Sequence, residues 1–210
     1  VPDREALLPR LAQVKKELEG TRFSFREDKR CVETVSPWGN RLRCHFPDPA
    51  RFGRMQLGVP YVEFDVPAGT AAGIARFYRE IMAAPATVAE DDQGHYARVM
   101  VGASQDFLFR ETDRPMAEYD GHHIQIYLTD FSGPYRRLIE RGLVTLETDE
   151  HEYRFKDIVD LDSGKALFTI EHEVRSMRHP LYGRPLVNRN PAQTNRDYMP
   201  GHDALSWARA

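Results

Sequence analysis

Two segments of the chain alternate between hydrophobic and polar residues in the manner of half-buried β-strands. In residues 61–66 every second side chain is apolar, and residues 123–128 repeat this pattern with Ile124 and Ile126. A period of two places successive side chains on opposite faces of a sheet. We therefore predict a strand in each segment, with one face in the core and one polar face.

Three other segments carry apolar residues at helical spacing. These are residues 7–18, 70–82 and 132–142, in which apolar side chains recur every three or four positions. This spacing forms one apolar stripe on a helix. Thr70 is the predicted N-cap of the second helix, and Gly142 is the predicted end of the third.

These elements recur with a period of about 62 residues. Gly39, Gly102 and Gly164, which open three late strands, lie 63 and then 62 positions apart, and Tyr61 and His123 also lie 62 apart. The repeat predicts α+β units of the order strand, helix, strand, strand, strand. The first copy lacks its opening strand, which we expect to precede residue 1. The predicted divisions are a partial unit at residues 1–46, a second unit at 59–111, a third at 118–174 that pairs with the second, and an extended tail at 175–210.

Composition excludes several classes of function. The 210 residues carry a net charge of -3 and no basic stripe, which argues against a nucleic-acid binder. No apolar run approaches the roughly 18 residues that a membrane-spanning helix needs, so we expect no membrane partner. Cys31 and Cys44 stand alone without a CxxC motif, and we expect reduced thiols, as in the cytoplasm.

Three motifs in register resemble the vicinal oxygen chelate superfamily, which includes glyoxalase I, fosfomycin-resistance enzymes, bleomycin-binding proteins and extradiol dioxygenases. Residues 75–80 (A-R-F-Y-R-E) are similar to the family's A-F-Y-x-x-x-L-G, and residues 123–130 (H-I-Q-I-Y-L-T-D) to H-I-A-F-x-V-x-D. Residues 160–164 (D-L-D-S-G), before a strand with Ile170 and Glu171, are similar to D-P-D-G-x-x-I-E. The resemblance implies tandem βαβββ units whose sheets curl into a cup. It also implies a divalent metal, Fe, Mn, Zn, Ni or Mg, on the floor of that cup.

The resemblance also implies which residues hold the metal. His123 matches the ligand on the first strand of a unit, and Glu171 matches the carboxylate on the last strand, with Glu173 as a weaker substitute. The third ligand stays open between two residues. Counting back from the helix without gaps gives Glu63, whereas aligning the strand patterns gives Tyr61. We expect His123, Glu171 and Glu63 to converge on one concave floor.

The other candidates line the same predicted cup. Glu171 and Tyr127 are the candidate catalytic residues. The candidate substrate-binding residues are Tyr61, Gln125, Arg110 and Gln105. An arginine inside a cup suits a carboxylate or phosphate on the ligand, although a solvated charge at a strand edge is the simpler explanation for any single arginine.

Two function hypotheses follow from the resemblance. The first is a metal-dependent lyase, isomerase or dioxygenase that acts on a small, oxygen-rich, anionic compound. The second is a metal-free protein of the bleomycin-resistance type that holds a small molecule. Because three units are an odd number, we also expect a homodimer, with residues 22–46 or the tail at residues 179–198 in the interface.

Overall fold

The computed structural model of the protein describes residues 1, 3–55 and 58–182. The chain forms two compact units, Val1–Pro60 and Tyr61–Ala210. Among the described residues, no helix is both long and apolar enough to span a bilayer. Most of the predicted interfacial tail, residues 179–198, lies outside the described residues.

The first unit contains a helix followed by a three-stranded antiparallel sheet in the order β1-β2-β3. Its elements are α1 (Arg4–Glu17), β1 (Ser24–Glu27), β2 (Cys31–Val35), β3 (Arg41–His45) and a short α2 (Pro49–Phe52). Both cysteines are free. Cys31 faces His45 across the ladder while Cys44 faces Val32, so the two thiols lie on opposite faces of the sheet.

The second unit contains two copies of the same order of helices and strands. The first copy consists of β4 (Tyr61–Pro67), α3 (Ala71–Glu80), β5 (Ala86–Asp91), β6 (Gly94–Gly102) and β7 (Gln105–Thr112). The second copy consists of β8 (His123–Leu128), α4 (Ser132–Glu140), β9 (Val144–Thr148), β10 (Glu152–Val159) and β11 (Ala166–Ser176). The sheet orders are β4-β7-β6-β5 and β8-β11-β10-β9. In each sheet the strand that comes first in the chain lies beside the strand that comes last and runs parallel to it, which pairs β4 with β7 and β8 with β11. The predicted α+β class and tandem βαβββ units are confirmed.

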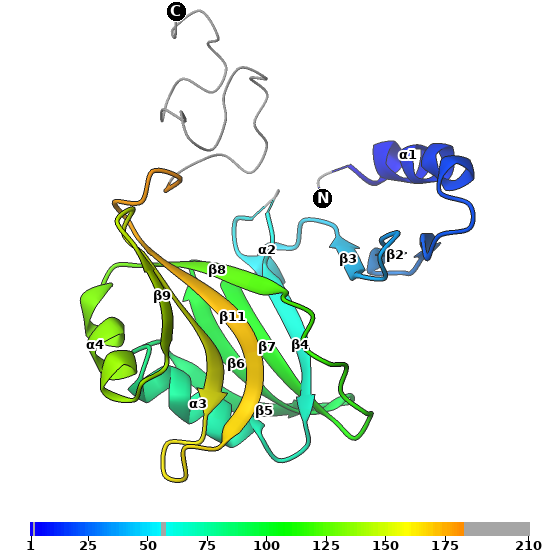
Figure 1. The fold of residues 1–210 in the computed structure, drawn as a ribbon. Coiled ribbons are helices and arrows are strands. Elements are labelled where there is room, and N and C mark those ends of the chain that lie inside the picture. The colour runs from blue at the N-terminus through cyan, green and yellow to red at the C-terminus, as the bar shows by residue number, and fades with distance from the viewer. Residues whose placement is uncertain (2, 56–57, 183–210) are drawn as a thin grey trace, which may run out of the picture. The chain divides into compact units, whose positions relative to one another are not determined.

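The two four-stranded sheets lie against each other in the second unit (Figure 1), and their apolar faces share one hydrophobic core. Phe64 on β4 stacks on Phe109 with ring centroids 5.2 Å apart, and Phe168 on β11 lies 6.1 Å from Phe64. Helix α3 packs against both sheets, with Phe77 5.9 Å from Phe155 of β10. Each sheet therefore turns its polar face away from this common core.

Helix α3 begins after Thr70, the predicted N-cap residue, but the side chain that makes the capping bond belongs to another element. The hydroxyl of Thr70 donates to the carbonyl of Pro67 at 2.6 Å and makes no capping bond. Glu111 on β7 accepts the free N–H of Ala71 instead, at 2.8 Å. A carboxylate at this position satisfies an unpaired donor and complements the positive end of the helix.

Candidate metal centre on the β8–β11 sheet

The residues of the candidate centre lie on one face of two neighbouring parallel strands, β8 and β11. In the ladder between β8 and β11, Glu171 lies beside His123 and Glu173 beside Gln125. These side chains share the polar face, while Ile170 and the other residues at alternate positions enter the core. Two carboxylates and an imidazole thus come together from strands about 50 residues apart in the sequence.

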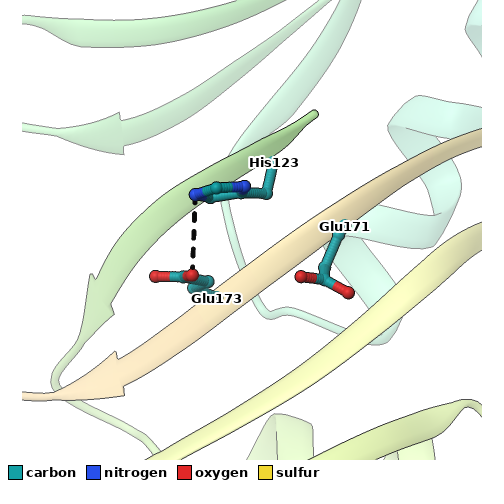
Figure 2. Close-up of side chains that lie close together, drawn as sticks. All are labelled: His123, Glu171 and Glu173. Carbon is teal, nitrogen blue, oxygen red and sulfur yellow. Dashed lines mark ion pairs between the residues drawn. The ribbon is translucent and has the colours of Figure 1, made fainter. Parts of the chain in front are cut away.

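His123, Glu171 and Glu173 each offer one ligand atom, and these atoms all lie within 4.8 Å of one another. Figure 2 shows the imidazole of His123 on β8 directed at Glu173 on β11, with the carboxylate of Glu171, also on β11, beside them. The His123 Nε2 to Glu173 Oε1 distance is 3.6 Å, and the His123 side chain is 53% exposed against 8% for Glu173. One imidazole nitrogen and two carboxylate oxygens are donors that suit Mn, Fe or Zn.

Arg154 on β10 connects the carboxylates of this centre. Its Nη1 donates to Glu171 Oε1 at 2.9 Å, and its Nη2 lies 2.8 Å from Glu173 Oε1. Its Nε donates to Glu152 Oε1 at 2.8 Å. A single guanidinium therefore bridges three carboxylates through its five-donor fork.

Arg175 on β11 continues the network toward β8. It donates to Glu152 Oε2 at 2.6 Å, to Glu173 Oε2 at 2.9 Å and to the amide oxygen of Gln125. Burial raises the pKa of Glu152, but hydrogen bonds from Arg175 and Arg154 outweigh it and hold this pKa below its usual value. The carboxylate of Glu152 therefore stays charged near neutral pH.

Sequence reasoning missed this network, although its signal is present. Residues Glu152, Arg154 and Lys156 alternate with Tyr153 and Phe155 on β10, so one face of that strand is charged and the other apolar. Arg154 lies opposite Glu173 because of the register between β10 and β11, which form a hairpin. Parity alone gives the face of each of these side chains, but the pairings across the hairpin also need its register.

The structure places Glu63 and Tyr61 away from the centre. Both lie on β4, in the other four-stranded sheet. Glu63 Oε2 is 3.5 Å from the Nε of Arg110, and Arg110 donates to both oxygens of Asp91 at 2.8 and 3.0 Å. Because both sheets turn their apolar faces to one core, the described chain does not bring Glu63 to His123 and Glu171. The same arrangement separates Arg110 from them.

The remaining predicted site residues divide between the two sheets. Gln125 and Tyr127 share the polar face of β8 with His123, and the ring of Tyr127 lies 5.3 Å from that of Tyr182. Gln105 is exposed at the start of β7 in the other sheet. Gln125 and Tyr127 therefore neighbour the candidate centre, and Gln105 does not.

Comparison with solved structures finds proteins of the glyoxalase and bleomycin-resistance type. The antibiotic-binding protein TnmS3 from Streptomyces sp. CB03234 is 18% identical, with a TM-score of 0.40 over 57% of this chain and 95% of its own. A glyoxylase/bleomycin resistance protein/dioxygenase domain from Frankia sp. EAN1pec is 18% identical, with a TM-score of 0.39 over 58% and 93%. The fosfomycin resistance protein FosX from Listeria monocytogenes, in complex with Mn(II), is 15% identical, with a TM-score of 0.40 over 58% and 93%. No protein-family model matches the sequence, and no curated protein does.

Proposed function

We propose that the protein is a divalent-metal-dependent enzyme acting on a small, oxygen-rich, anionic compound, by lyase, isomerase or dioxygenase chemistry. The supporting observation is the cluster of His123, Glu171 and Glu173, whose ligand atoms lie within 4.8 Å of one another. A metal on three such donors keeps coordination positions for substrate oxygens and acts on them as a Lewis acid.

The donors differ in how well they fit this role. The exposed His123 is accessible from solvent, and Glu171 Oε2 has Lys156 Nζ as a distant cation at 3.9 Å. Both oxygens of Glu173 already face arginine donors. His123 and Glu171 are therefore the primary ligand pair of the proposal, and Glu173 is the third donor. Gln125 and Tyr127 would contact the substrate beside them.

The second candidate function is metal-free binding of a small molecule, and the charge balance of the site favours it. Three carboxylates, those of Glu152, Glu171 and Glu173, face three cations on the same sheet. These cations are Arg154, Arg175 and Lys156. A neutral cluster attracts a divalent ion less strongly than three unpaired carboxylates would. Elemental analysis of the purified and reconstituted protein separates the two functions, because only the first requires a stoichiometric metal.

Replacing His123 with alanine should weaken Mn²⁺ binding by at least roughly tenfold without unfolding the protein, because loss of even an outer-shell partner of a metal ligand has an effect of that size and His123 is an exposed primary donor. Isothermal titration of Mn²⁺ measures this change, and circular dichroism checks the fold. His122→Ala is the matched control, because His122 is an exposed neighbour that pairs with Asp120 instead. Equal affinity in both variants would contradict the assignment of His123.

We also propose a homodimer that involves the first unit. The first unit exposes Leu42 (47%) and Trp38, which at 80% is the most exposed large hydrophobic side chain of the described residues. Such a surface suits contact with a second copy of the chain. Sedimentation should show a dimer at micromolar concentration, and Trp38→Ser with Leu42→Ser should weaken it. A monomer at that concentration would refute this part of the proposal.

A further inference from the structure

We propose that the guanidinium of Arg154 is a built-in competitor for the metal, and that it sets the affinity of the centre for divalent cations. The inference rests on the proposed function, because Arg154 contacts the same carboxylates that a metal would use. It assigns an affinity-determining role to a residue that is not itself a ligand.

The contacts of Arg154 are those of a cation in a carboxylate cage. Its three nitrogens contact three different carboxylates, those of Glu152, Glu171 and Glu173, at 2.8 to 2.9 Å. Two of these carboxylates belong to the cluster shown in Figure 2. A metal on Glu171 and Glu173 must share or replace the donors that Arg154 now supplies.

Of the two arginines that contact these carboxylates, Arg154 is better placed than Arg175 to move. Its side chain is 27% exposed, whereas that of Arg175 is 11% exposed and is held by Glu152, Glu173 and Gln125. Once Arg154 turns away, Glu171 and Glu173 regain the lone pairs that a metal needs, while Arg175 still holds Glu173 in place. Arg154 therefore competes with the metal, and Arg175 positions Glu173.

Removing the competing charge should strengthen metal binding. A positive charge a few ångströms from a divalent ion repels it, so neutralising Arg154 should tighten binding by at least roughly tenfold. A purely structural role for Arg154 predicts the opposite result, because disordered carboxylates bind a metal less well.

The test is isothermal titration of Mn²⁺ into the wild-type chain, Arg154→Gln and Arg98→Gln. Arg98 is the charge-matched control, because it pairs with Asp106 at 2.7 Å in the other sheet. We expect at least tenfold tighter binding in Arg154→Gln and no change in Arg98→Gln. Unchanged or weaker binding in Arg154→Gln, with binding by the wild type, would overturn the inference and leave the proposed function standing.

The other outcomes separate the two proposals. Binding by Arg154→Gln alone would support the inference and contradict a metal-dependent wild type, and binding by neither chain would contradict both. If Arg154→Gln does not fold, Arg154→Met replaces it, because methionine is also neutral and keeps an unbranched apolar stem in place of that of the arginine. Its affinity should lie above that of the wild type, and an unchanged affinity would overturn the inference.

Discussion

Replacing Glu152 with glutamine should lower the free energy of unfolding by about 3 kcal/mol. The side chain of Glu152 is only 5% exposed, and its two oxygens accept hydrogen bonds from Arg154 and Arg175. Loss of its charge takes one of two shared carboxylates from two largely buried guanidinium groups, which then share only Glu173. Urea unfolding followed by circular dichroism measures the change.

Glu140→Gln is the control for this variant, because Glu140 is exposed on α4. A surface substitution of this kind is expected to change stability by less than about 0.5 kcal/mol. If Glu152→Gln and Glu140→Gln lose the same small amount, the network on the β8–β11–β10 face does not stabilise the fold.

Acid should destabilise the protein through His172, a core histidine on β11. His172 is fully buried, and burial lowers its pKa to about 4. Its Nδ1 lies 2.9 Å from the carbonyl of Ile170, which only accepts, so the proton sits on Nδ1. The hydroxyl of Tyr78 then donates to Nε2 at 2.5 Å. The neutral imidazole therefore has both of its hydrogen bonds inside the core.

The pH range over which stability changes follows from the lowered pKa of His172. The folded state binds the proton less readily than the unfolded state, in which the pKa is about 6.5, so stability rises with pH. The contribution of neutral His172 is complete above about pH 6.5 and is lost as the pH falls toward 4, a total of about 3 kcal/mol.

Comparison with a double variant separates the contribution of His172 to acid sensitivity from that of the carboxylates, which also titrate in this pH range. Tyr78→Phe with His172→Leu removes the imidazole and leaves no unpaired hydroxyl behind. Urea unfolding at pH 7, 5.5 and 4 should show that the wild type loses about 3 kcal/mol more than the double variant. Parallel losses in the two proteins would show that His172 does not carry the acid sensitivity.

Much of the fold could be predicted because strand parity and the repeat are local properties of the sequence. The alternation predicted β8 over residues 123–128, which are its observed bounds. The same parity placed His123 and Glu171 on one polar face, and the parallel ladder pairs them directly. A period of two gives the polar face of each strand, because it depends only on neighbouring residues, whereas the family resemblance was needed to expect the two strands to contribute to one site.

The rest depended on how distant elements meet. The polar face of β4 was predictable, but the common core that separates Glu63 from His123 arises from α3 packing against both sheets. The pairing of Tyr78 with His172 joins residues 94 apart in the chain. Its one local signal was a histidine at a core position of β11, between Ile170 and Val174.

The central claim is that His123 and Glu171 hold a divalent metal on the polar face of the β8–β11 sheet. An anomalous difference map from crystals of the protein soaked in Mn²⁺ tests it most directly. We expect a peak bonded to Nε2 of His123 and to the carboxylate of Glu171. A map without a peak at these residues, or with one only beside Glu63 and Asp91 in the other sheet, would contradict it.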